Sequence, residues 1–152
     1  MADIKQVASN RKAFHDNEIF ERVEAGLSLT GTEIKSIRAN GASIREAYAR
    51  PQNDEMWLYG AHIAEYVAGS YQNHEPVRPR RLLLHRKQIR EWARAIAERG
   101  LTVVPLSLYL KDGMAKVELG LVRGRKQYDK RQAIAKREAD RDIARALRHR
   151  NR

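Results

Sequence analysis

Positive charge is concentrated at the carboxyl end of the chain, and this limits which part can fold on itself. Of the thirty residues from 123 to 152, twelve are Lys or Arg and four are Asp or Glu. This segment has no Trp or Phe, a single Tyr, and only three Ile or Leu residues. A segment with so little apolar surface cannot fill a core. We therefore predict a folded body over residues 1–122 and a basic tail over residues 123–152.

The whole chain of 152 residues has a formal net charge of +11, which indicates a polyanionic partner. A membrane is disfavoured because no run approaches the roughly 20 apolar residues of a spanning helix. The amino-terminal residues also lack the apolar core of a signal peptide. The chain has no cysteine, which excludes a disulfide framework and Cys-ligated zinc. These features favour nucleic acid as the partner, and the lack of cysteine fits a reducing cytoplasm.

The body alternates between the hydrophobic periods of strands and of helices. Apolar residues in every second position predict a strand around Ile19 and Val23, followed by a short helix from Gly31 with Ile34 and Ile37 on one face. Two further strands, over 43–50 and 56–66, are expected around a turn at residues 51–54. Residues 69–79 are expected to form a loop.

The clearest element is a helix over 84–99. Its expected buried stripe consists of Ile89, Trp92, Ala93, Ile96 and Ala97. Gly100 follows where a glycine ends a helix. Strands over 101–110 and 114–122 are then expected to form a hairpin, because Asp112-Gly113 tolerates positive φ. The pattern predicts a mainly β fold with helices, a small antiparallel barrel in one domain.

Motifs of catalysis are missing from the sequence. It has no Gly-rich phosphate loop and no H-E-x-x-H, and its five histidines lack the spacing of metal ligands. We expect no catalytic residue, metal or cofactor. A ribonuclease that uses His74 and His85 as acid and base is the enzyme alternative. Histidines that bond to backbone or phosphate are the favoured interpretation.

Several groups are candidates for contact with RNA. Asn10-Arg11-Lys12 precedes the first strand, and five cations surround Leu82-Leu83-Leu84, whose leucines are expected in the core. Those five cations are Arg78, Arg80, Arg81, Arg86 and Lys87. They suit phosphate contacts and a solvated loop about equally well.

Aromatic and acidic residues offer two more alternatives. Trp57 and Tyr59 share one strand face and either stack on bases or pack in the core, and the core is favoured. Trp92, at helical spacing, is expected in the core. Glu24 and Glu33 either accept hydrogen bonds from RNA or pair with nearby Lys or Arg, and pairing is favoured.

The tail has a helical pattern of its own. Ala135, Ala139, Ile143 and Leu147 recur every four residues, and Arg137, Arg141 and Arg145 follow the same spacing on another face. Like charges at this spacing destabilise an isolated helix. We therefore expect a flexible tail that becomes helical on a polyanion.

Six segments together resemble the SmpB family of bacterial SsrA-binding proteins. They are Asn10-Arg11-Lys12-Ala13, His15-Asp16, Glu24-Ala25-Gly26, residues 29–38 (LTGTEIKSIR), Arg80-Arg81-Leu82-Leu83-Leu84-His85 and residues 124–131 (GRKQYDKR). The resemblance implies an OB-like antiparallel barrel with about three helices and a basic, flexible tail. It also implies a protein, monomeric when free, that has no catalytic activity or cofactor.

The resemblance further implies two partners. One is the tRNA-like domain of transfer-messenger RNA, which the protein carries to stalled ribosomes so that incomplete chains are tagged. The other is the ribosome, at its small-subunit decoding centre and mRNA channel, where the tail becomes helical. The runner-up function is that of a general barrel-type RNA-binding or ribosome-associated protein.

The resemblance assigns the site residues by position. Residues on the RNA-binding side of the barrel are Asn10, Arg11, Lys12, Glu24, Leu83 and Lys116. Residues on the segment that enters the decoding region, with the tail, are Gly124, Lys126, Tyr128, Asp129, Lys130, Arg131, Arg137, Ile143 and Leu147. There are two departures from the family: Asn17-Glu18 stands where Tyr-Phe or Tyr-Glu is common, and Phe14 replaces a frequent Arg.

Overall fold

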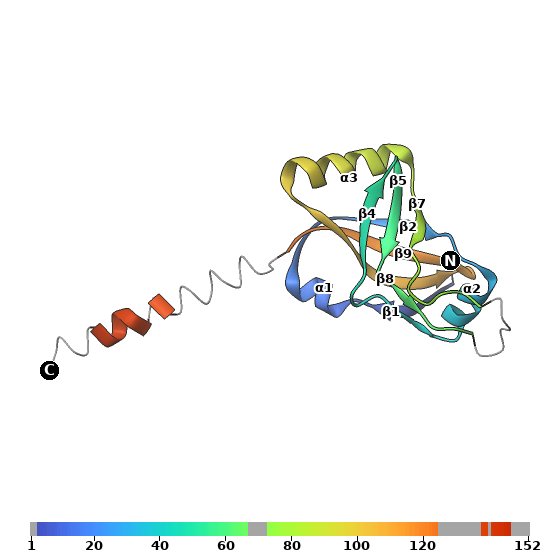
Figure 1. The fold of residues 1–152 in the computed structure, drawn as a ribbon, viewed down its shortest axis with the longest axis horizontal. Coiled ribbons are helices and arrows are strands. Elements are labelled where there is room, and N and C mark those ends of the chain that lie inside the picture. The colour runs from blue at the N-terminus through green and yellow to red at the C-terminus, as the bar shows by residue number, and fades with distance from the viewer. Residues whose placement is uncertain (1–2, 67–72, 125–137, 140, 147–152) are drawn as a thin grey trace.

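The computed structural model describes residues 3–66, 73–124, 138–139 and 141–146 (Figure 1). The strands are β1 (Ile4–Ser9), β2 (Asn17–Leu27), β3 (Ala42–Ser43), β4 (Tyr48–Gln52), β5 (Glu55–Tyr59), β6 (His62–Ile63), β7 (Arg80–Leu83), β8 (Thr102–Lys111) and β9 (Met114–Gly124). The helices are α1 (Arg11–Asp16), α2 (Gly31–Arg38) and α3 (Arg86–Arg99). Residues 138–139 and 141–146 are also helical.

The large sheet is antiparallel and closes on itself. Its strands follow the order β1-β8-β4-β5-β7-β2-β9, and β9 pairs again with β8. The pairings therefore run around a ring of six strands, with β1 added on β8 (Figure 1). Strands β3 and β6 form a separate short pair. This is the mainly β, OB-like architecture that was expected.

The core fills the inside of this ring. Alternate residues of β5, β7 and β9 point inward, among them Met56, Leu82 and Val117, and all three are buried. Helix α3 lies across one end of the ring (Figure 1) and contributes Ile89 and Trp92 to the core. The indole Nε1 of Trp92 donates to Glu21 Oε2 at 2.8 Å. Trp92 is a core residue, as predicted.

Three local predictions are confirmed. Helix α2 begins at Gly31 with a capping box between Thr30 and Glu33. Gly100 ends α3 with φ of 65°. Asp112 and Gly113, with φ of 52° and 79°, join β8 to β9. In each case the signal lies within a few residues of the structure that it specifies.

Other boundaries differ from the prediction. The strand expected over 43–50 is split into β3 and β4, and the one expected over 56–66 into β5 and β6. The split in the second falls at Gly60, whose φ of 75° interrupts an extended chain. Helix α3 begins at Arg86, two residues late, because His85 at its N-cap is extended. Ala97, expected in the buried stripe of that helix, is exposed.

The end of the folded body also shifts. Strand β9 continues to Gly124, where Arg123 pairs with Glu18 and Gly124 pairs with Asn17. These two residues, which composition placed in the tail, are part of the barrel. Helix α1 was not predicted at all, since its six residues are too few to show a periodic pattern.

Candidate nucleic-acid interface

Three residues that lie far apart in the sequence meet on the outside of the barrel. In the strand register, Gly26 of β2 pairs with Lys116 of β9 on one side and with Leu83 of β7 on the other. Glu24 lies two residues along β2, on the same outward face. A groove of about 590 Å³ lies over this row. Among the residues that line it are Glu24, Gly26, Arg81, Leu83, Arg86 and Lys116.

The floor of the groove holds an exposed leucine. Leu83 is 47% exposed, whereas its neighbour Leu82 is buried. The expectation that residues 82–84 all lie in the core is therefore wrong for Leu83, because alternate residues of a strand point to opposite faces. Gly26 makes room for Leu83, since a Cβ there would lie only 3.1 Å from the Leu83 Cβ. An apolar side chain held in this way offers a contact surface for a ribose or for the flat face of a base.

Glu24 is held as an anion at the rim of the groove. The Tyr109 hydroxyl donates a hydrogen bond to Glu24 Oε2, and Lys111 Nζ lies 3.4 Å from Oε1. The bond from Tyr109 lowers the pKa of Glu24, and the charges of Lys111 and Lys116 reinforce this against the opposing effect of burial. Burial and the Glu24 carboxylate raise the pKa of Tyr109. Tyr109 therefore keeps its proton at neutral pH and Glu24 remains an acceptor.

The side chain of Asn10 has a structural role. Its side chain is 3% exposed, and its Oδ1 accepts from Ala13 N at 3.1 Å as the N-cap of α1. Its Nδ2 donates to the carbonyl oxygens of Ile44 and Pro105 at 3.2 and 3.0 Å. Every polar atom of the amide is thus used within the protein. The structure gives Asn10 the role of anchoring the helix that carries Arg11 and Lys12.

Arg11 and Lys12 line a separate hollow. Both are exposed, and with Ser9, His15, Ser43 and Arg45 they surround a depression of about 610 Å³. Lys12 Nζ lies 3.4 Å from Glu46 Oε1, an ion pair open to solvent. The residues that the resemblance assigned to one RNA-binding side are therefore divided between this hollow and the groove.

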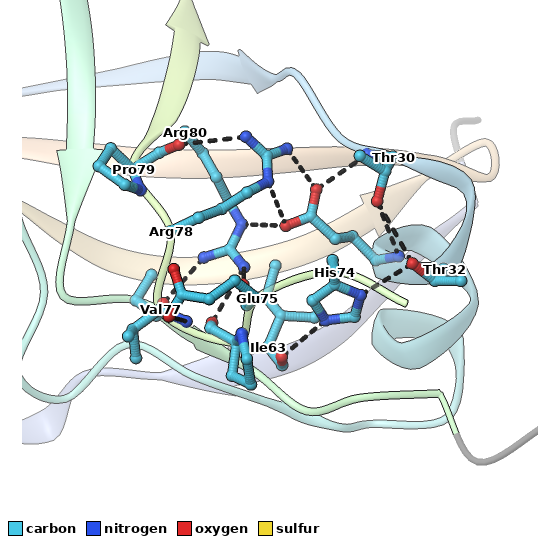
Figure 2. A network of polar contacts seen from close by, with 12 residues as sticks. Thr30, Thr32, Ile63, His74, Glu75, Val77, Arg78, Pro79 and Arg80 are labelled. Atoms are coloured by element: carbon cyan, nitrogen blue, oxygen red, sulfur yellow. Dashed lines mark hydrogen bonds and ion pairs between the residues drawn. The ribbon is translucent and has the colours of Figure 1, made fainter. Parts of the chain in front are cut away.

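A buried ionic network joins helix α2 to the start of β7 (Figure 2). Glu33 is fully buried, and its carboxylate accepts from the guanidinium groups of Arg78 and Arg80 and from the backbone N–H of Thr30. Arg80 is 0% exposed and also donates to the carbonyl oxygen of Ala61 at 2.8 Å. Two of the five cations considered for phosphate are therefore committed to Glu33. The favoured interpretation of Glu33, pairing with arginine, is confirmed.

His74 belongs to the same network and is also buried. Its Nε2 lies 2.8 Å from the carbonyl oxygen of Ile63, so this nitrogen carries the proton, and its Nδ1 lies 2.9 Å from the Thr32 hydroxyl (Figure 2). Both ring nitrogens are used within the protein, while His85 is exposed. This geometry disfavours the ribonuclease alternative, which needs both histidines at the RNA.

The described residues hold neither a metal site nor a membrane-spanning helix. No group of three or more His, Cys, Asp or Glu residues among them is placed to hold a metal ion. Within the same part of the chain, every helix is too short or too polar to cross a membrane.

The tail residues are only partly covered by the structure. Gly124 is the last residue of β9. Ile143 lies in the helical stretch 141–146 and is 59% exposed. The remaining residues assigned to the decoding region or the tail lie outside the described residues: Lys126, Tyr128, Asp129, Lys130, Arg131, Arg137 and Leu147. Their roles stay predictions, as does the disorder of the free tail.

Tyr109 and Arg81 are site residues that sequence reasoning did not single out. The position of Tyr109 between Leu108 and Leu110 on a predicted strand already indicated an outward side chain. Its partner Glu24 is 85 positions away, and no local pattern connects the two. Arg81 was one of the five cations considered for phosphate contacts. Its role differs from that of its neighbour Arg80 because Arg80 is buried.

Comparisons with known proteins agree with one another. The family described as SmpB protein matches residues 7–149. An SsrA-binding protein of Roseiflexus sp. is 57% identical over 152 residues, which cover 99% of this chain and 96% of the relative. One from Acidothermus cellulolyticus is 56% identical, over 94% of this chain and 90% of the relative.

A solved structure from the same family is also similar to this chain in its fold. It is described as "tmRNA-SmpB: a journey to the center of the bacterial ribosome", and its matching chain has a TM-score of 0.65 and 46% identity. The match covers 78% of this chain and 84% of that chain. With a family match over nearly its whole length and relatives more than half identical to it, this chain belongs to the SmpB family.

Proposed function

We propose that the protein binds the tRNA-like domain of transfer-messenger RNA and delivers it to stalled ribosomes, so that incomplete proteins are tagged and the ribosome is released. The observation that carries this proposal is the meeting of Glu24, Leu83 and Lys116 in one groove. The names of its relatives, SsrA-binding proteins, support the choice of RNA.

The groove suits a folded RNA better than a free strand. Lys116 supplies one cation for phosphate, Leu83 an apolar contact, and Glu24 an acceptor for a 2′-hydroxyl or a base amino group. The major groove of A-form RNA is closed to side chains, so such a surface recognises shape and phosphate geometry. All three groups supply binding contacts, and the role proposed for the protein is that of an RNA-binding factor.

The second partner is the ribosome. The basic residues beyond Gly124 suit the small-subunit decoding region and the mRNA channel, where messenger RNA competes for the same space and charge. A protein of this kind bridges two RNA partners, works as a monomer when free and is cytoplasmic. A general RNA-binding or ribosome-associated role remains the second candidate, supported by the high net charge alone.

A competition experiment separates the two candidates. The tRNA-like domain of transfer-messenger RNA is titrated in gel shifts at about 0.15 M salt, where non-specific attraction is weakened. We expect the complex to survive an excess of elongator tRNA and of single-stranded RNA. Equal displacement by either competitor would leave only the general role.

A pair of variants tests the groove itself. Lys116→Gln removes a cation from the groove, and Lys5→Gln removes one from the exposed face of β1. We expect Lys116→Gln to weaken binding and to lower the slope of log affinity against log salt by about 1. Lys5→Gln should leave this slope close to that of the parent. Identical behaviour of the two variants contradicts the assignment of the groove.

A further inference from the structure

The outward face of β4 and β5 carries aromatic rings and an arginine that the groove does not use. Tyr48 pairs with Tyr59 across the two strands, and Arg50 pairs with Trp57. Met56 and Leu58 of β5 are buried, so Trp57 and Tyr59, between and beyond them, point outward. The favoured interpretation of Trp57 and Tyr59 as core residues is therefore wrong. Tyr48 is 42% exposed on the same face.

Three of these side chains, Tyr48, Arg50 and Tyr59, pack against one another in one layer over the strands. The rings of Tyr48 and Tyr59 are stacked, with centroids 5.5 Å apart and planes inclined by 19°. The guanidinium of Arg50 lies 5.5 Å from the centroid of Tyr48 and 6.0 Å from that of Tyr59. The hydroxyl of Tyr59 donates to Gln52 Oε1 at 3.0 Å. A half-exposed layer of this composition offers π-faces to bases and a cation to phosphate.

The layer is continuous with the groove. Trp57 pairs with Arg81 of β7, so Arg50, Trp57 and Arg81 form one row across three strands. Arg81 and its ion-pair partner Glu55 both line the groove. Leu83 lies two residues from Arg81 on the same outward face of β7. Adjacent strands are about 4.8 Å apart, so the layer begins within one nucleotide's reach of the groove.

We propose that Tyr48, Arg50, Trp57 and Tyr59 form a stacking platform for unpaired bases of the same RNA whose folded part lies in the groove. This inference rests on the proposed function. The occupant follows from the positive charge of Arg50 and Arg81 and from the shared border with the groove. Stacking is tolerant of base identity, so the platform adds affinity for RNAs that present unpaired bases at this distance from a helical region.

The test uses a double variant that changes no charge. Tyr48→Leu with Trp57→Leu keeps apolar side chains on the hairpin but removes two π-faces. The control is Phe20→Leu, because Phe20 is also a half-exposed aromatic residue flanked by arginines, Arg99 and Arg123, elsewhere on the barrel. Circular dichroism and thermal melting first establish that all three proteins are equally folded. If the double variant melts early, Tyr48→Leu alone replaces it.

Binding of the tRNA-like domain is then titrated at several salt concentrations. We expect the platform variant to lose from about fivefold to above a hundredfold in affinity, since stacking is worth about 1–3 kcal/mol per base. Its salt slope should equal that of the parent, because no phosphate contact is lost. Phe20→Leu should bind like the parent. Parental affinity of a folded platform variant overturns the proposal.

Cross-linking gives an independent readout. The tRNA-like domain is transcribed with 5-bromouridine, irradiated in the complex, and the attached peptides are mapped by mass spectrometry. Cross-links to Tyr48, Trp57 or Tyr59 support the platform, and cross-links confined to groove residues overturn it. Failure of the proposed function looks different: Lys116→Gln would then bind the RNA as the parent does, whatever the platform variant does.

Discussion

At the scale of single residues, the buried Glu33 and Arg80 connect the stability of the protein to its site. Arg80 begins β7, the strand that holds Arg81 and Leu83 outward, and its guanidinium has no access to water. Its charge is balanced by Glu33, 47 positions earlier in the chain. A buried ion pair adds little compared with an apolar pair, but removal of one partner leaves an uncompensated charge. The pair therefore holds the segment before β7 against α2.

Glu33→Gln should therefore be strongly destabilising. We expect the free energy of unfolding to fall by about 3–5 kcal/mol in urea titrations, the usual cost of a broken buried pair. The matched control is Glu46→Gln, whose partner Lys12 is exposed. Surface pairs of that kind contribute about 0–1 kcal/mol. Equal losses in the two variants would mean that the network does not hold the barrel.

The same carboxylate makes stability depend on pH in acid. Burial raises the pKa of Glu33, but the hydrogen bonds from Arg78, Thr30 and Arg80 and the charge of Arg80 outweigh it, so that the pKa lies below its ordinary value of 4.5. The native protein then binds fewer protons here than the unfolded chain, so this stabilisation is present above the unfolded pKa. It is lost as the pH falls through the lower, native pKa.

We expect the parent to lose stability more steeply than Glu33→Gln as the pH falls below 4.5, the ordinary pKa of glutamate in the unfolded chain. Urea unfolding between about pH 5 and pH 2.5 measures this difference. Parallel curves would show that other carboxylates cause the acid sensitivity.

At the scale of elements, signals from neighbouring residues were sufficient to predict where a helix begins or ends and where two strands are joined by a turn. The turn at Asp112-Gly113, the helix start at Gly31 and the stop at Gly100 depend on adjacent residues, and all three were predicted. The break at Gly60 was not, because it depends on a distant neighbour. A Cβ at Gly60 would lie 2.8 Å from the backbone oxygen of Glu46, and the two strands expected around residues 51–54 do not reveal how closely these backbones approach.

The candidate site, too, could be predicted from the sequence only in part. The residue types at 24, 83 and 116 were assigned by family resemblance, but their meeting depends on the registers of three strands. Arg80 and Arg81 are neighbours with the same side chain, and the sequence could not tell the buried one from the exposed one. Their difference arises from strand alternation and from the position of Glu33 across the fold.

Two glycine variants test the reason for the break between β5 and β6. Gly60 and Gly100 have similar positive φ, 75° and 65°, but a Cβ at Gly100 would meet nothing within 4 Å. We expect Gly100→Ala to cost about 1 kcal/mol of stability through conformation alone. Gly60→Ala should cost clearly more, because the clash is added to the same conformational term. Thermal or urea unfolding checks this, and equal costs would mean that the loop relaxes freely.

At the scale of the whole molecule, the proposed function separates a barrel that holds RNA from a basic segment that acts on the ribosome. Deletion of residues 132–152 should therefore leave binding of the tRNA-like domain unchanged, since the groove and its network lie within residues 24–116. The same deletion should abolish tagging in a reconstituted translation assay with stalled ribosomes. Full tagging by the shortened chain would refute this division, and loss of RNA binding would place part of the RNA contact in the tail.

The row formed by Lys116, Gly26 and Leu83 has an evolutionary consequence. Because side chains alternate along a strand, one residue inserted or deleted within β2, β7 or β9 would exchange the inward and outward faces beyond that point. Lineages can therefore vary the chemistry of the groove by substitution, whereas gain or loss of a residue disturbs the groove least in the turns, such as Asn53-Asp54 and Asp112-Gly113, or at a bulge such as that of β2 between Ile19 and Glu21. Related proteins must therefore preserve the lengths of these strands more strictly than the identities of the residues in them.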